Sequence, residues 1–187
     1  MRYLIVVLLS AFIGGANAVE FNQVLADKST LSFNYKQMGV PMEGKFRRFT
    51  ARMIFDPVKI STAQAQLDVE LASIDTGVTE ADEEVVGKQW FNAKTFPTAR
   101  FVSTGVKALG GSRYEVVGKL TIKGITRDVS APFTYTQKGS TGIFDGAFVL
   151  KRLDYSIGEG PWADVSAIAN EIQIKFHLVA IAAPSKK

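Results

Sequence analysis

The stretch GKLTIKGITRDVSAPFTYT, residues 118–136, reads as two β-strands that fold onto each other. Leu120 and Ile122 alternate with polar side chains, and residues 124–127 then break the run. A second alternation follows, and its apolar side holds Val129, Ala131, Phe133 and Tyr135. A period of two places one set of side chains against an apolar interior and the other set in water. That interior holds either packed side chains alone or a guest molecule as well.

Alternating runs of the same kind cover most of the chain. We expect strands over residues 31–36, 42–46, 49–55, 63–71, 99–106, 114–122, 129–136, 143–153 and 168–181. Glycine-rich turn signals separate many of them, which is typical of an all-β sandwich or barrel. The strands are long for a sandwich, and glycines stand inside three of them, at Gly44, Gly118 and Gly146. These features favour a closed antiparallel β-barrel of about eight strands.

The apolar side chains shift once from even to odd positions, between Phe46 and Phe49. Arg47 and Arg48, which lie between these residues, can both face water only if the strand bulges there. Because bulges help a sheet to curl and close, we expect a bulge at this point of the barrel.

One segment departs from the strand pattern. The stretch VTEADEEVVGKQWF, residues 78–91, carries four acidic side chains near its start. Acids in the first turn complement the helix N-terminus, and Thr79 with Asp82 has the spacing of a capping box. We therefore expect one short helix from Glu80 to Trp90 that lies against or across the barrel. The same acids lack the spacing of a calcium-binding loop.

The first eighteen residues are expected to be a signal peptide rather than part of the fold. Arg2 precedes an apolar run over residues 3–13, and the small-x-small pattern at residues 16–18 marks a cleavage site. Residues 19–187 are then a single barrel domain. The chain contains no cysteine, which excludes disulfides, thiol catalysis and cysteine-based metal sites. We expect a periplasmic protein exported through this cleavable peptide.

Catalytic and metal-binding patterns are missing from the sequence. The chain has one histidine, His177, which has the opposite parity to Ile174 and Phe176 in an expected strand. We interpret it as a solvated strand residue, since a catalytic histidine needs an orienting partner and a reachable nucleophile. One histidine cannot form a multi-histidine metal centre. We therefore expect no catalytic residue, no metal and no cofactor.

A basic cluster, KFRRFTAR, contains Lys45, Arg47, Arg48 and Arg52. It is read as a solvated outer face, or alternatively as a basic rim that attracts a phosphate or carboxylate headgroup. The formal net charge of +4 is mildly basic, and nucleic acid is not an expected partner of an exported domain.

Four stretches resemble, in order, the signatures of the YceI-like family: STLSFNYKQMGVPMEGKF, LASIDTGVTEADEEVVGKQWFNAKTFPTARF, GKLTIKGITRDV and LKRLDYSIGEG. The resemblance implies an exported bacterial protein with a lipocalin-like barrel and an elongated apolar lumen for a long isoprenoid. Two departures bear on the ligand headgroup. Gln37 stands where the common pattern has histidine, and residues 81–85 read Ala-Asp-Glu-Glu-Val where it has Arg-Asp-x-His-Leu.

From the parity pattern and the resemblance together, we expect non-covalent binding, transport or storage of a long-chain isoprenoid-like amphiphile, such as a polyprenyl or quinone-type lipid. The side chains expected to line the lumen and contact this ligand are Phe33, Tyr35, Met42, Phe46, Phe49, Met53, Trp90, Phe91, Phe101, Leu120, Phe133 and Phe148. Burial of each methylene of the tail contributes about 0.8 kcal/mol. Asp82, Arg152 and Asp154 are expected to make structural polar contacts.

Two alternatives stay open. One is an accessory subunit that docks on a membrane b-type cytochrome. The other is an enzyme that acts on a lumen-bound lipid with Asp82 or Asp154 in an acid–base role. Contact with a membrane surface and a homodimer are also left open.

Overall fold

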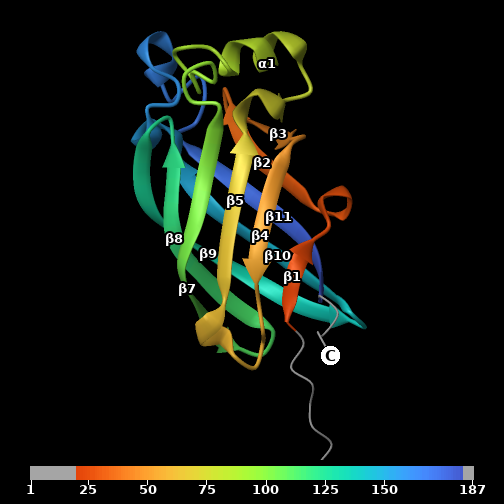
Figure 1. The fold of residues 1–187 in the computed structure, drawn as a ribbon. Coiled ribbons are helices and arrows are strands. Elements are labelled where there is room, and N and C mark those ends of the chain that lie inside the picture. The colour runs from red at the N-terminus through yellow and green to blue at the C-terminus, as the bar shows by residue number, and fades with distance from the viewer. Residues whose placement is uncertain (1–19, 183–187) are drawn as a thin grey trace, which may run out of the picture.

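In the computed structural model, residues 20–182 form one curled antiparallel sheet of eleven strands (Figure 1). The strands are β1 (Phe21–Val24), β2 (Thr30–Gln37), β3 (Val40–Phe46), β4 (Phe49–Ile54), β5 (Gln64–Glu70), β6 (Ile74–Asp75), β7 (Thr98–Gly110), β8 (Arg113–Ile122), β9 (Ile125–Lys138), β10 (Thr141–Lys151) and β11 (Glu171–Ala182). The predicted all-β, lipocalin-like architecture is confirmed. Nine of the strands correspond to the nine expected ranges, and the other two, β1 and β6, have only four and two residues, which is too short to show a period. The expected signal peptide, residues 1–18, lies outside the described residues.

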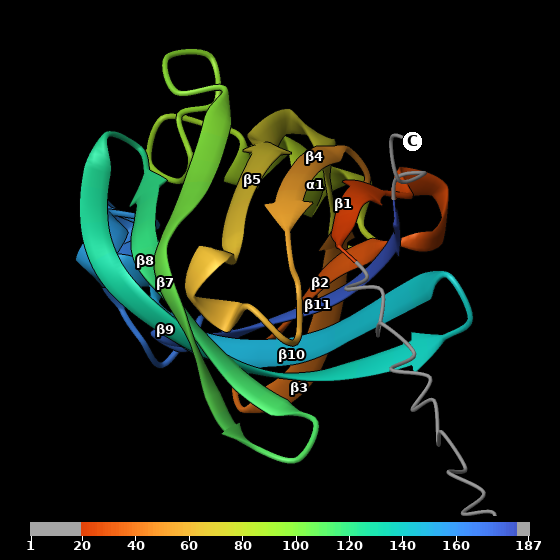
Figure 2. The ribbon, with the colours of Figure 1, turned by 60° about the horizontal axis from the view of Figure 1, so that its bottom comes forward.

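One α-helix, α1 (Thr79–Val85), is present in the described residues and lies across one end of the barrel (Figure 1). Five short 3-10 helices connect other elements: η1 (Ala26–Lys28), η2 (Ile60–Thr62), η3 (Leu71–Ser73), η4 (Arg152–Tyr155) and η5 (Gly160–Ala163). We call the end that carries α1, η4 and η5 the helix end. The opposite end carries η2, the first residues of β1 and the last residues of β11, and we call it the terminal end (Figure 2).

The strand order ends at β4 on one side and at β3 and β6 on the other, and β3 and β4 are consecutive in the sequence. The order runs β4-β5-β7-β8-β9-β10-β11-β2-β3-β6, with β1 paired to β11. At the seam, the chain bends at Arg47 and Arg48 from β3 into β4, so the predicted bulge is instead a break between two strands. The Arg47 N–H donates to the Ser73 carbonyl, which fixes the bend. Near the terminal end, Phe21 and Phe55 exchange backbone hydrogen bonds of 2.9 and 3.0 Å across the same seam.

The hairpin over residues 118–136 forms as predicted, but its turn is tighter than expected. Lys123 and Gly124 both have positive φ, 52° and 78°, and Ile122 pairs directly with Ile125. Two left-handed residues in a two-residue loop match the right-handed twist of the flanking strands. Strand β9 therefore begins at Ile125, and residues 125–127 belong to it rather than to a break.

Glycines inside the strands make room for aromatic rings on neighbouring strands. A Cβ at Gly44 would lie 2.4 Å from the Phe33 ring, and one at Gly118 would lie 2.6 Å from the Phe101 ring. Rings that cover backbone in this way let adjacent strands bend around the interior. The interior glycines thus contribute to curvature, as the sequence indicated.

Helix α1 ends at Val85, five residues before the predicted end at Trp90. Gly87 follows two β-branched valines, and both residue types disfavour helix continuation. The chain proceeds through successive turns, in which the Gly87 N–H donates to the Glu84 carbonyl and the Trp90 N–H donates to the Gly87 carbonyl. The predicted capping box is absent from α1, whose N-cap makes no side-chain hydrogen bond.

Candidate functional site

The curled sheet encloses a cavity of about 640 Å³. Side chains of the ten strands β2–β11 form its walls, and residues of α1 and the following turns border it at the helix end. The volume falls within the range of about 300–1,000 Å³ that is typical of small-molecule sites. Because most lining side chains are apolar, the cavity suits a hydrocarbon chain rather than a hydrophilic ligand.

Ten of the twelve predicted lumen residues lie on the cavity wall: Phe33, Tyr35, Phe46, Met53, Trp90, Phe91, Phe101, Leu120, Phe133 and Phe148. They come from segments far apart in the sequence, and the curl of the sheet brings them to one interior. That these side chains contact a ligand remains a prediction.

Met42 and Phe49 do not line the cavity. Met42 is half-buried on a part of β3 that has no strand beyond it, because β6 pairs only with Lys45 and Phe46. Phe49 follows the bend between β3 and β4 and borders a separate surface hollow beside Arg48. Parity along a strand shows which side chains share a face, but it does not show where the enclosing wall ends.

Several wall residues were not among the predicted lumen residues. They include Leu31, Phe55, Leu67, Phe144, Ile172, Ile174, Phe176 and Leu178. The sequence did carry a signal for the four residues of β11, residues 172, 174, 176 and 178, because they alternate with the polar side chains of Gln173, Lys175 and His177. Strand β11 therefore contributes a full apolar face to the cavity.

Arg152 is fully buried at the helix end and supports the irregular chain there. Its five guanidinium N–H groups donate to the backbone carbonyls of Ala169, Ile157, Gly158, Trp162 and Ile168, at 2.7–3.2 Å. No described Asp or Glu forms an ion pair with it, and burial lowers the pKa of this arginine. The predicted structural role of Arg152 is thus evident in its contacts.

The Arg152 guanidinium contacts both tryptophans of the helix end, because it donates to the Trp162 carbonyl and lies over the Trp90 ring. The guanidinium carbon lies 5.5 Å from the Trp90 ring centroid, within the range of a cation–π contact. The two indole centroids are 5.4 Å apart. Trp90 lines the cavity, and its Nε1–H is buried without a hydrogen-bond partner in the described residues. An unpaired buried donor is costly, and this one belongs to a side chain that lines the cavity at the helix end.

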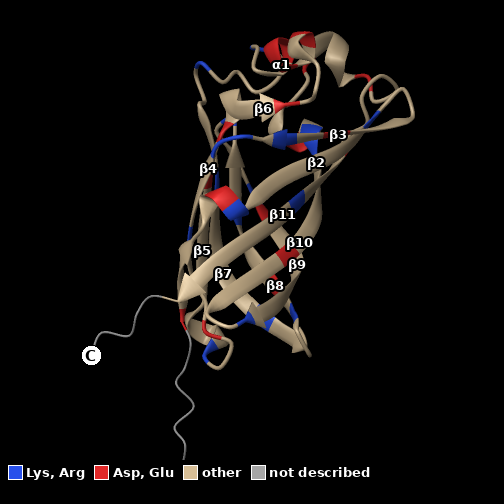
Figure 3. Cartoon of the chain, turned by 90° about the vertical axis from the view of Figure 1, so that its right-hand side faces the viewer, with Lys and Arg blue, Asp and Glu red and all other residues tan. Residues whose placement is uncertain are grey.

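Further polar groups border the cavity at the helix end. Gln37, Thr76, Glu80 and Glu84 lie on its wall together with the Tyr35 ring, and Figure 3 shows the acidic residues of α1, coloured red, at this end of the barrel. Burial, and then the nearby charge of Asp82, raises the pKa of Tyr35.

Asp82 and Asp154, the residues that an enzymatic role would need, do not line the cavity. The Asp82 carboxylate accepts hydrogen bonds from the N–H and the hydroxyl of Thr76, both at 2.7 Å. The backbone carbonyl of Asp154, rather than its carboxylate, accepts from Arg127. Asp82 therefore makes the structural polar contact that was expected.

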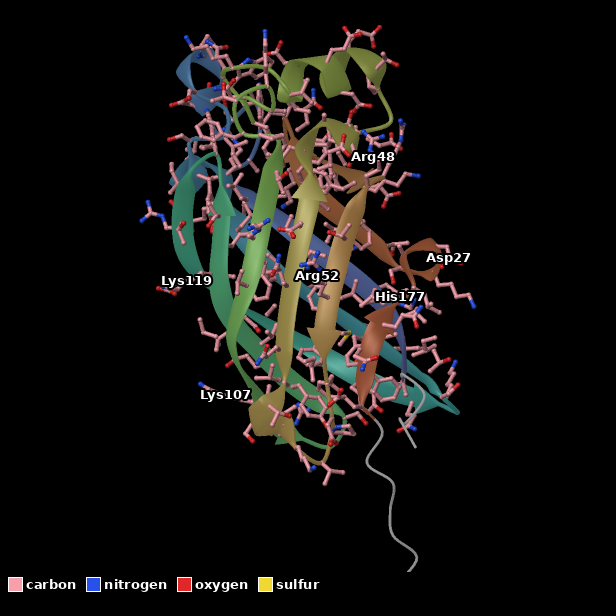
Figure 4. All side chains as sticks on the ribbon, viewed as in Figure 1. Asp27, Arg48, Arg52, Lys107, Lys119 and His177 are labelled. Atoms are coloured by element: carbon pink, nitrogen blue, oxygen red, sulfur yellow. The ribbon has the colours of Figure 1, made fainter. Side chains whose placement is uncertain are left out.

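Three members of the basic cluster, Lys45, Arg47 and Arg48, are paired at the surface, whereas Arg52 forms no ion pair with a described residue and borders the cavity. Arg48 donates two hydrogen bonds to Glu70, and these hold the pKa of Glu70 below its usual value. Arg47 donates to Asp75 at 3.0 Å, and Lys45 lies 3.6 Å from the same carboxylate. Arg48 and Arg52 are exposed (Figure 4). These contacts fit a solvated outer face better than a basic rim around a headgroup.

His177 lies apart from the cavity wall (Figure 4). Its Nδ1 is 2.6 Å from the Asp145 carboxylate, and both side chains are about half exposed. Within residues 20–182, no three His, Cys, Asp or Glu side chains gather closely enough to hold a metal ion. Among the same residues, no helix has the length and apolar composition that crossing a membrane requires.

Comparison with known proteins gives consistent results. Residues 23–180 match the family model of the YceI-like domain. A UPF0312 protein of Azotobacter vinelandii is 27% identical over 158 residues, which cover 79% of this chain and 82% of that protein.

Solved structures agree with this result. BcnA of Burkholderia cenocepacia is 47% identical with a TM-score of 0.83, over 84% of this chain and 99% of that one. A polyisoprenoid binding domain from Saccharophagus degradans shares the fold at 15% identity and a TM-score of 0.66, over 89% of this chain and 99% of that one. The chain therefore belongs to the YceI-like family, whose signatures its sequence resembles.

Proposed function

We propose that this protein binds a long-chain isoprenoid-like amphiphile, a polyprenyl or quinone-type lipid, and transports or stores it in the periplasm. The observation that carries the proposal is the cavity of about 640 Å³, which lies among the side chains of ten strands and is not filled by them. The structural relative from Saccharophagus degradans is described as a polyisoprenoid binding domain, and this supports the chemical class of the ligand.

The energetics favour a long apolar tail. Each methylene that leaves water contributes about 0.8 kcal/mol, so affinity can come from the tail with few polar contacts. The polar groups around Trp90 and Thr76 occur at the helix end, which suits the headgroup. The tail then extends toward the terminal end, where the wall is aromatic.

The test is mass spectrometry of an organic extract from the protein purified from its native host. We expect one prenyl lipid per chain for the wild type. Ala51→Phe, which places a ring in the cavity, should lose the lipid, whereas Thr50→Phe on the exposed face of the same strand should keep it. An extract without stoichiometric lipid, repeated after incubation with prenyl lipids, would contradict the proposal.

The periplasmic location has its own test. Fractionation of the native host should place the protein in the periplasmic extract, and N-terminal sequencing of that material should begin at Val19. Recovery in the cytoplasm with residues 1–18 attached would overturn the location without affecting lipid binding.

A further inference from the structure

We propose that a layer of three phenylalanines at the terminal end sets the longest prenyl tail that the cavity accepts. This inference rests on the proposed function and adds a determinant of specificity to it. The layer consists of Phe55, Phe133 and Phe144, and all three side chains line the cavity. We call these three residues together with Phe21, Tyr114 and Tyr135 the aromatic plug.

The three cavity-facing rings contact one another. The ring centroids of Phe55 and Phe144 are 5.0 Å apart, and each lies 6.2 Å from the centroid of Phe133. These distances are within the range of favourable aromatic pairs. Each ring is at most 8% exposed, so the triangle forms a continuous apolar floor.

A second set of rings supports the first and is separated from the cavity by it. Tyr135 lies 4.9 Å from Phe55 and 5.2 Å from Phe144, and Tyr114 lies 5.3 Å from Phe55. Phe21 lies 6.2 Å from Phe144 and is fully buried. Phe21, Tyr114 and Tyr135 do not line the cavity. The floor is therefore two rings deep.

Backbone pairing holds the plug in place. Its residues lie in β1, β8, β9, β10 and the segment after β4, and the register pairs Tyr114 with Phe133 and Tyr135 with Phe144. Phe21 and Phe55 are joined by two backbone hydrogen bonds. Because buried side chains in close-packed interiors have little space to move, displacing these rings would cost a lipid tail substantial free energy.

This geometry predicts how affinity depends on tail length. Each added methylene that enters the cavity should lower Kd about fourfold, since 0.8 kcal/mol corresponds to that factor. Once the tail reaches the phenylalanine layer, further isoprene units stay in water at the helix end. Kd should then stop falling, and the length at which it stops is set by the plug.

The test measures Kd for a homologous series of prenyl alcohols with wild type, Phe144→Leu and Phe21→Leu. Both substitutions replace a buried phenylalanine of the plug by leucine, but only Phe144 touches the cavity. We expect Phe144→Leu to move the plateau to longer alcohols, with at least about tenfold tighter binding of the next homologue. Phe21→Leu should leave the plateau where it is, and thermal unfolding shows that each variant is folded.

The possible outcomes separate this inference from the proposed function. If the wild type binds prenyl alcohols but all three proteins reach the plateau at the same length, the plug does not select tail length, while lipid binding stands. If Phe21→Leu moves the plateau as far as Phe144→Leu does, the assignment of the floor to the cavity-facing rings is wrong. If the wild type binds no prenyl alcohol, the proposed function and this inference fail together.

Discussion

The two ends of the cavity are built from different chemistry. At the terminal end, six aromatic rings pack against one another, and the Tyr135 hydroxyl reaches away to donate to Gln137. At the helix end, a buried guanidinium, an unpaired indole N–H and several cavity-lining polar side chains lie among turns and 3-10 helices. The aromatic rings of one end favour hydrocarbon, whereas the polar groups of the other favour a headgroup.

The difference follows from the local backbone. Regular strands satisfy their own carbonyls, so the terminal end is free to direct aromatic side chains inward. The segments at the helix end, η4 and η5 among them, leave carbonyls that need other donors, and Arg152 supplies five N–H groups to them. The irregular chain that closes this end therefore needs the buried guanidinium of Arg152 as its hydrogen-bond donor.

The largest expected effect concerns Arg152. Arg152→Leu leaves five backbone carbonyls without their donor, and each unsatisfied buried group costs about 1–3 kcal/mol. Urea unfolding should show a loss of at least about 3 kcal/mol. Arg152→Lys keeps the charge but has fewer donors, so its free energy of unfolding should lie between those of the wild type and Arg152→Leu. A loss below about 1 kcal/mol would show that the helix end does not depend on this arginine.

A smaller effect is expected at the terminal end and depends on pH. Burial, followed by the charges of Tyr114 and Asp56, raises the pKa of Tyr135 from its ordinary 10.0 to about 12. As the pH rises from 10 to 12, the unfolded chain loses this proton while the folded chain keeps it, so the folded state loses stability. The slope is about 1.4 kcal/mol per pH unit for this residue.

Tyr135→Phe removes that titration, and unfolding measured between pH 9 and pH 12 should be less steep in the variant. Some slope should persist, because burial also raises the pKa of Tyr35 and of Tyr155. An identical slope in variant and wild type would mean that the folded chain does not shield the Tyr135 hydroxyl from water.

The smallest effect concerns the headgroup. Glu80 and Glu84 line the cavity mouth, whereas the neighbouring Glu83 does not. Glu80→Gln and Glu84→Gln should therefore tighten binding of a prenyl phosphate by a few-fold at low salt and leave a prenyl alcohol unaffected. Glu83→Gln is the matched control and should change neither. Equal changes for the phosphate and the alcohol would contradict a headgroup position beside α1.

The regular part of the fold was well predicted from the sequence, and the reason is physical. Period-two alternation reports which face of a strand is buried, so β2, β5, β8 and β10 were found with small errors at their ends. Strands β1 and β6 were missed because their pairing depends on the seam and on the bend near Arg47, which are tertiary features.

The candidate site was predicted to a similar extent. Alternation placed most of the wall residues, among them Phe101 and Leu120, on the interior side. It could not separate Phe144, which faces the cavity, from Phe21, which is buried behind it, because both belong to apolar strand faces. Nor could it show that the interior is hollow, since that depends on the volume left between the strands.

Tryptophan fluorescence tests the central claim most directly, because the chain has two tryptophans, Trp90 and Trp162, and both lie at the helix end. The measurement compares quenching by two prenyl amphiphiles, one brominated on the headgroup and the other at the tip of the tail. The orientation derived from the two ends predicts strong, saturable quenching by the headgroup bromine and little quenching by the tail bromine. Stronger quenching by the tail bromine would reverse the orientation, and no quenching by either would contradict binding in the cavity.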